Sequence, residues 1–89
     1  MLKPTSMPIA AMTIDLPVMT PPLKRSVTID GHRTSVSLED AFWKALNKEA
    51  GRHAITRAAL ISQIDHARPP EIGLATALRL YVLHRTAQG

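Results

Sequence analysis

The sequence predicts a mainly α protein with a short antiparallel β-ribbon and an additional C-terminal helix. The dipeptide Asp30-Gly31 separates two runs rich in β-branched residues, which is the strongest local signal for a hairpin. After Leu38 the apolar residues return at a helical period as far as Gly51. Two further helical patterns follow, separated by the break at Arg68-Pro69-Pro70.

A tight turn at Asp30-Gly31 predicts the register of the ribbon, with Ile29 opposite His32 and Lys24 opposite Ser37. Side chains of paired residues share a face, so the ribbon has one polar and one apolar face. The polar face holds Lys24, Ser26, Thr28, Arg33, Ser35 and Ser37. The apolar face holds Val27, Ile29, Thr34 and Val36, followed by Leu38, and the exceptions to the pattern are Arg25 and His32.

This polar face has two interpretations. A two-stranded ribbon fits the major groove of DNA, where arginine and short polar side chains reach base edges. A half-buried ribbon that only presents polar residues to water shows the same alternation. The sequence that follows the ribbon favours the first interpretation.

The first helix has predicted signals at both ends. Ser37 to Asp40 resembles a capping box, with Asp where Glu is usual, and Gly51 is suited to end the helix because it accepts a left-handed φ. The second helix is expected to begin near Thr56, and the third to span Leu74 to about Arg85.

Trp43 lies about one helical step from the apolar stripe of the first helix. We expect it to pack on the third helix. The alternative is an exposed contact for a partner.

These residues resemble the ribbon-helix-helix DNA-binding family. The similar segment runs from Arg33 to about Asp65 and contains an alternating strand, a capped helix, a Gly-Arg turn and a second helix. The segments KRSVTIDGHRTSVSLEDAFW and LATALRLYVL further resemble a bacterial subfamily with an extra N-terminal strand and a third helix. The resemblance implies an intertwined homodimer whose paired strands enter the major groove.

The resemblance also implies the site residues. By position, the residues that contact bases are Arg33, Ser35 and Ser37. The residues expected at phosphates are Lys24, Arg25, Arg52, Ala54, Ile55, Thr56 and Arg57, most of them at the start of the second helix. The expected dimer core is Val36, Leu38, Phe42, Leu46, Ile55 and Ile61. The extra strand departs from the simplest family pattern, because pairing of residues 24–29 in cis would give the dimer a four-stranded sheet.

Charge and size agree with a polyanionic partner and with dimerisation. Lys and Arg number 11 against 7 Asp and Glu, giving a net charge of +4, and all of the excess falls in residues 24–89. A domain of this size has a marginal core when alone, and a second copy would enlarge it. The absence of cysteine excludes disulfides and thiolate metal sites and fits the cytoplasm, with association to the nucleoid when DNA is bound.

Residues 1–23 form a separate Pro- and Met-rich segment, with five of the seven prolines and all four methionines. We expect a flexible arm, since this proline spacing forbids a regular helix. The alternative is a peptide that docks on another protein or on the neighbouring subunit. The segment lacks the features of a signal peptide, and no apolar run in the chain is long enough to span a membrane.

Catalysis is not expected. The four histidines, His32, His53, His66 and His84, are dispersed without metal-ligand spacing. Asp65-His66 could belong to a catalytic arrangement, but the chain contains neither a nucleophile elbow nor a phosphate loop. We therefore expect no catalytic residue, no metal and no cofactor.

Two functional hypotheses remain. The first is a sequence-specific transcription regulator, a repressor or autoregulator that acts as a dimer on double-stranded DNA, with higher-order assembly left open. The second is a protein-interaction adaptor or antitoxin-like protein that uses residues 1–23 and the third helix.

Overall fold

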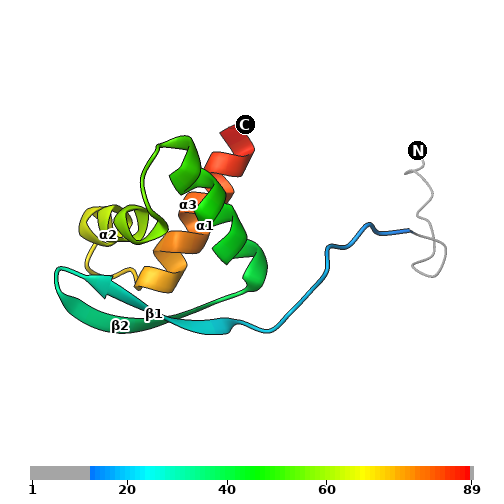
Figure 1. Ribbon diagram of the computed structural model, residues 1–89. Coiled ribbons are helices and arrows are strands. Elements are labelled where there is room, and N and C mark those ends of the chain that lie inside the picture. The colour runs from blue at the N-terminus through cyan, green and yellow to red at the C-terminus, as the bar shows by residue number, and fades with distance from the viewer. Residues whose placement is uncertain (1–12, 89) are drawn as a thin grey trace, which may run out of the picture.

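The computed structural model describes residues 13–88, in which a hairpin is followed by three helices that lie on one side of it (Figure 1). The elements are β1 (Leu23–Ile29), β2 (His32–Leu38), α1 (Asp40–Arg52), α2 (Arg57–Ala67) and α3 (Leu74–Gln88). The predicted fold class, a short antiparallel ribbon with two helices and an additional C-terminal helix, is confirmed. Among the described residues, no helix is long and apolar enough to cross a membrane.

The hairpin has the predicted register. Ile29 pairs with His32, Lys24 with Ser37, and the ladder extends one pair further to Leu23 and Leu38. Asp30 and Gly31 have φ values of 52° and 79°, as a type I′ turn requires. The turn residues therefore set the register of the whole ribbon.

The two faces of the hairpin differ in burial as predicted. The inner face packs against the helices through Val27, Ile29, Val36 and Leu38, which are at most 8% exposed. All six side chains of the polar face are exposed. Thr34, expected on the inner face, is exposed as well. The buried side chains of β2 therefore lie only in the half of the strand that is distant from the turn.

The start of α1 differs from the sequence prediction. Glu39 occupies the N-cap position, and no side chain bonds to the first amides of the helix. The predicted cap by Ser37 is wrong, because Ser37 still belongs to β2 and pairs with Lys24. The strand therefore continues through the position that the cap would need.

The end of α1 also lies further along the chain than predicted. The helix continues through Gly51 to Arg52, and the residue with left-handed φ is Ala54, at 56°. This conformation lets the Ala54 amide donate to the Gly51 carbonyl at 3.1 Å and the Ile55 amide donate to the Ala50 carbonyl at 3.0 Å. The last carbonyls of α1 are thus satisfied by the linker itself.

The helix α2 begins as predicted, with Thr56 as its N-cap. The Thr56 hydroxyl accepts a hydrogen bond from the Ala59 amide at 3.0 Å. The helix α3 begins at Leu74 as expected and continues three residues beyond Arg85 to Gln88.

All five elements contribute to one core. Leu38, Leu46, Ile61 and Leu78 are completely buried, and they come from β2, α1, α2 and α3 respectively. Val27 of β1 belongs to the same cluster. A single chain therefore closes a continuous core, in which α3 covers the side of α1 and α2 that would otherwise face solvent.

The hairpin turn is tied to α2 by an ion pair that should depend on pH. His66 Nε2 lies 2.7 Å from Asp30 Oδ2, and this hydrogen bond raises the pKa of His66 above its usual value. The pair stabilises the fold fully below the pKa of unfolded histidine, about 6.5, and its contribution is lost as the pH rises through the higher folded pKa. We expect the wild type to lose more free energy of unfolding than Asp30→Asn when urea titrations at about pH 5.5 and about pH 8.5 are compared.

Asn is the matched replacement in this test, because it adopts left-handed φ readily and keeps the turn while removing the charge. An equal loss in the two proteins would show that the ion pair does not contribute to stability.

Candidate nucleic-acid interface

The outer face of the hairpin presents two parallel rows of polar side chains. Thr28 lies beside Arg33, Ser26 beside Ser35, and Lys24 beside Ser37. The face contains two cations and four hydroxyl groups, and no carboxylate. It can donate hydrogen bonds from its cations and both donate and accept through its hydroxyls, which suits base edges and phosphates.

The backbone of the same β2 residues is directed to the free edge of the hairpin. In a two-residue hairpin, the pair flanking the turn is hydrogen-bonded and every second pair is not. Arg33, Ser35 and Ser37 belong to the pairs without these bonds, so their N–H and C=O groups point away from β1. Consistent with this, the Ser37 carbonyl accepts a bond from Arg79 Nη2 of α3 at 3.4 Å. Within the described chain β2 pairs only with β1, and its other edge is open for pairing at Arg33 and Ser35.

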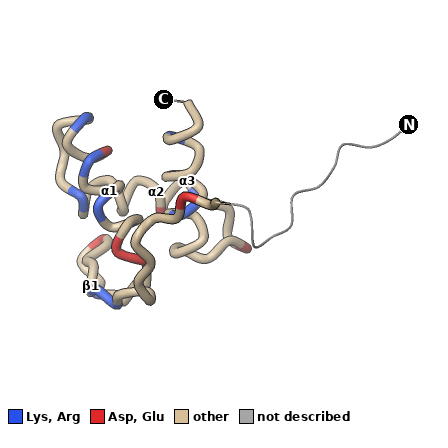
Figure 2. The backbone as a smooth tube through the Cα atoms, turned by 90° about the vertical axis from the view of Figure 1, so that its right-hand side faces the viewer, with Lys and Arg blue, Asp and Glu red and all other residues tan. Residues whose placement is uncertain are grey.

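The basic residues divide into an ion-paired group and an unpaired group. In the described part of the chain, carboxylates pair with Lys44, Arg52, Arg68, Arg79 and Arg85. No ion pair is formed by Lys24, Arg25, Arg33, Lys48 or Arg57 within residues 13–88. Figure 2 marks the charged positions on the backbone, with blue segments on the hairpin beside β1. Of the five unpaired cations, three thus lie on the hairpin and one at the start of α2, while Lys48 lies on α1.

Trp43 connects two of these free arginines. Its indole is 1% exposed, and its Nε1 donates to the Leu23 carbonyl of β1 at 3.1 Å. The guanidinium carbon of Arg25 lies 5.5 Å from the ring centroid and that of Arg57 lies 5.2 Å from it. Both are within the range of cation–π attraction. The ring therefore contacts one arginine from β1 and one from α2.

The hydrogen bond and the cation–π contacts of the Trp43 ring are with β1 and α2. The side chain also belongs to the buried cluster that contains Leu78 and Val82 of α3. The alternative of an exposed partner contact is wrong, because the ring is 1% exposed.

The start of α2 offers fewer backbone donors than predicted. The amides of Ala54 and Ile55 already donate to carbonyls at the end of α1, so they are not free to bind a phosphate. Within residues 13–88 the amides of Thr56, Arg57 and Ala58 donate to no backbone acceptor. Of the three backbone positions expected from the sequence, only Thr56 keeps an open donor, and the open donors continue into the first turn of α2.

A hollow of about 360 Å³ lies between β1, α1 and α2 beside this helix start. Its lining includes Ser26 and Thr28 of β1, Asn47 of α1, and Arg57 and Ala58 of α2. Asn47 and Ala58 were not identified from the sequence, because their proximity to β1 depends on how the helices pack. The hollow combines a cation with hydroxyl and amide groups.

The residues expected in a dimer core are largely the core of the single chain. Those already buried in it are Val36, Leu38, Leu46 and Ile61. Phe42 and Ile55 pack at the edge of the core and remain partly exposed. Of these six residues, only Phe42 and Ile55 therefore have apolar surface left for a second copy.

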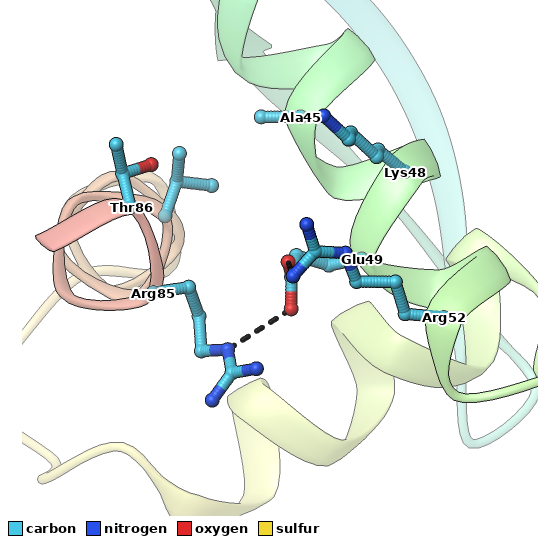
Figure 3. A pocket seen from close by; sticks show the side chains of 7 residues that line it. Ala45, Lys48, Glu49, Arg52, Arg85 and Thr86 are labelled. Atoms are coloured by element: carbon cyan, nitrogen blue, oxygen red, sulfur yellow. Dashed lines mark hydrogen bonds and ion pairs between the residues drawn. The ribbon is translucent and has the colours of Figure 1, made fainter. Parts of the chain in front are cut away.

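In a second cluster of charges, between α1 and α3, one carboxylate meets two arginines (Figure 3). Glu49 is 7% exposed and accepts a hydrogen bond from Arg85 Nε at 3.0 Å, with Arg52 at 3.4 Å and His53 at 3.8 Å. Burial alone would raise the pKa of Glu49, but the hydrogen bond and charge of Arg85 and the charge of Arg52 bring it below its usual value. This cluster joins two helices, and it leaves Arg52, expected at a phosphate, paired to a carboxylate.

Three of the four histidines have different hydrogen-bond or ion-pair partners in the described structure. His53 approaches Glu49, His66 bonds to Asp30, and His84 bonds to Gln88. Among residues 13–88, no three His, Cys, Asp or Glu side chains are placed to hold a metal ion together.

The comparison with known families agrees with this geometry. The model of the ribbon-helix-helix domain matches residues 22–86, from just before β1 to near the end of α3. No curated protein and no solved structure shows a significant match. Ribbon-helix-helix domains typically form dimers and bind DNA as transcription regulators. The match covers most of the sequence, both strands and all three helices included, and the chain therefore belongs to the ribbon-helix-helix family.

Proposed function

We propose that the protein is a sequence-specific transcription regulator that acts as a dimer, with the outer face of its hairpin in the major groove of DNA. The observation that supports this most directly is the outer face itself, which is exposed, carries cations and hydroxyls, and has no carboxylate. The cations of the hairpin and of the start of α2 lack ion-pair partners in the described chain, as expected for a surface that meets phosphates.

Arg33, Ser35 and Ser37 are the proposed base-contacting residues. A guanidinium can bind guanine O6 and N7 through two hydrogen bonds, whereas a serine hydroxyl donates or accepts with little base preference. Most of the direct sequence discrimination is therefore assigned to Arg33.

Phosphates are proposed to bind beside this face. Lys24, Arg25 and Arg57 supply unpaired charge, and the open amides that follow Thr56 add donors at the positive end of α2. Arg52 would have to leave Glu49 to take part. Ala54 and Ile55 contribute through the shape of the linker, since their amides are occupied.

The proposed dimer forms through the open edge of β2. Two β2 strands related by a two-fold axis near Ser35 would pair antiparallel, with Arg33 of each chain opposite Ser37 of the other. Arg79 would release the Ser37 carbonyl, and β1 would become the outer strand of a four-stranded sheet. The regulator would act as a repressor or autoregulator in the bacterial cytoplasm, associated with the nucleoid when bound.

Substitution of two arginines tests the division between base and phosphate contacts. Arg33→Ala is expected to lower affinity for a duplex selected from a random pool by about 1–3 kcal/mol while changing affinity for unrelated DNA less. Arg57→Ala is expected to weaken binding to both duplexes about equally and to reduce the slope of log affinity against log salt by about 1. Fluorescence anisotropy over a salt series measures both quantities. Equal losses of discrimination in the two variants would contradict the assignment of the reading face.

A second candidate function has its own supporting observation. The segment before β1 exposes Ile14, Leu16, Val18 and Met19, and α3 exposes Leu80 and Leu83. Such apolar surface is typical of a protein-interaction adaptor or an antitoxin-like protein that engages a partner protein. Affinity for DNA that is low and independent of salt would favour this candidate over the regulator.

A further inference from the structure

Residues 13–22, which we call the apolar arm, have large apolar side chains and almost no contact with the rest of the chain. Ile14, Leu16 and Val18 are 65%, 63% and 88% exposed. They alternate along a segment without helix or strand, and in an extended chain alternate side chains point the same way. Pro17, Pro21 and Pro22 exclude a regular helix. The apolar arm therefore offers a row of apolar side chains that its own domain does not cover.

A groove between α2 and α3 offers a complementary surface. This α2–α3 groove, of about 410 Å³, is lined by Ile64, Ala67, Arg68, Pro69, Ile72, Ala77, Leu80 and Tyr81. Leu80 is 54% exposed at the groove, and Leu83, one helical turn further along α3, is 63% exposed. A second hollow that shares Ile64, Ala67 and Tyr81 extends the same surface toward Ile55 and Leu60. Because the two hollows share three lining residues, they adjoin each other between α2 and α3.

The arm and the groove of one chain lie at opposite ends of the hairpin. Arg68, which lines the groove, also lines a hollow with Ile29 and Asp30 at the turn. The arm joins the domain at Leu23, at the other end of β1, which is about 20 Å away along a strand of this length. Figure 1 shows the arm leaving the domain in the direction away from α2. The stiff Pro21-Pro22 pair opposes an immediate reversal of the chain at this point.

We propose that the apolar arm of one copy docks in the α2–α3 groove of a second copy. Both surfaces lack a partner within residues 13–88, both are apolar, and the hairpin separates them within one chain. A two-fold exchange would place each arm in the groove of the other chain, so both would be covered in one closed assembly. The outer face of the hairpin takes no part in this contact, so the inference does not depend on DNA binding.

Disulfide trapping tests the docking in the full chain, because the sequence contains no cysteine. Leu16→Cys and Leu80→Cys are made as separate variants, mixed in equal amounts and oxidised, and covalent dimers are quantified by non-reducing electrophoresis. The mixed dimer, in which the cysteine of one variant is joined to the cysteine of the other, is expected to form at least about tenfold faster than the dimer of a matched control. In this control Lys44→Cys replaces Leu80→Cys. Lys44 is 78% exposed on α1, outside the groove, and so reports random collision.

A second measurement uses the mass of the assembly. The double variant Leu16→Ser with Val18→Ser alters only exposed side chains, so circular dichroism should match the wild type. Its self-association constant, measured by sedimentation without DNA, is expected to fall at least about tenfold if the docked arm contributes to assembly. This measurement does not require the cysteine variants to fold or react normally.

Three results would overturn the proposal. The first is equal trapping rates with Leu80→Cys and Lys44→Cys. The second is a disulfide within one chain when both cysteines are placed in the same molecule and diluted, which would show that the arm returns to its own groove. The third is unchanged self-association of the serine variant, which would leave the groove to a different protein.

Discussion

Ser35→Pro is expected to prevent two copies from pairing while leaving each hairpin intact. The Ser35 amide points to the open edge of β2, so its loss removes no hydrogen bond to β1. Proline is tolerated at such an edge position, but it removes the donor at the centre of the proposed two-fold ladder. A dimer that contacts two half-sites gains about 10²–10⁴-fold from joining them, so affinity for a two-site duplex should fall by an amount in that range.

Ser26→Pro is the matched control for this test. Ser26 lies directly opposite Ser35 on β1, and its amide points to the opposite edge of the hairpin. The Ser26→Pro substitution should therefore introduce similar local strain without removing a hydrogen bond between the two β2 strands of the dimer. Sedimentation of both variants against the wild type gives their masses. A dimer that survives Ser35→Pro, or is lost equally with Ser26→Pro, would exclude pairing through β2.

The ribbon was predictable because its signals are local. Asp30-Gly31 specifies the turn, the turn sets the pairing, and the alternation from Lys24 to Ser37 then determines which side chains are exposed. The ends of α1 could not be predicted in this way, because the conformation at each end depends on competition between neighbouring segments. Ser37 is a good capping residue, but β1 holds it in the strand. Gly51 is a good terminator, but the left-handed residue is Ala54, from which the linker can reach the last carbonyls of α1.

The candidate site also has a part that the sequence predicts and a part that depends on tertiary packing. The exposure of Arg33, Ser35 and Ser37 follows from the alternation of side chains between the two faces of a strand. This part of the expectation is confirmed by the structure. The role of Trp43 depends on residues far away in sequence, Leu23 on one side and Arg57 on the other, which periodicity does not reveal. The burial of much of the expected dimer core within one chain depends on β1 and α3, the two additions to the simplest ribbon-helix-helix pattern.

Trp43→Ala is expected to destabilise the protein by about 3–5 kcal/mol, because it leaves a cavity where the largest buried side chain of the core stood. The Nε1 hydrogen bond to the Leu23 carbonyl is lost as well, which removes a tie between α1 and β1. In a chain this small, such a loss is a large fraction of the total stability. Urea unfolding followed by circular dichroism measures it, with Leu83→Ala as the exposed control, expected to change stability by no more than about 0.5 kcal/mol.

The arginine contacts of Trp43 are tested separately with a milder change. Trp43→Phe keeps an aromatic ring but weakens cation–π attraction and loses the indole N–H. If the ring positions Arg57, the effects of Trp43→Phe and Arg57→Ala on DNA affinity should not add, with a coupling of about 0.5–1 kcal/mol in a double-mutant cycle. A Lys44→Ala partner in place of Arg57→Ala should give additive effects, since Lys44 pairs with Asp40 and the cation–π contacts of the ring in residues 13–88 are with Arg25 and Arg57. Additivity in both cycles would restrict Trp43 to a packing role and leave the two arginines to act independently.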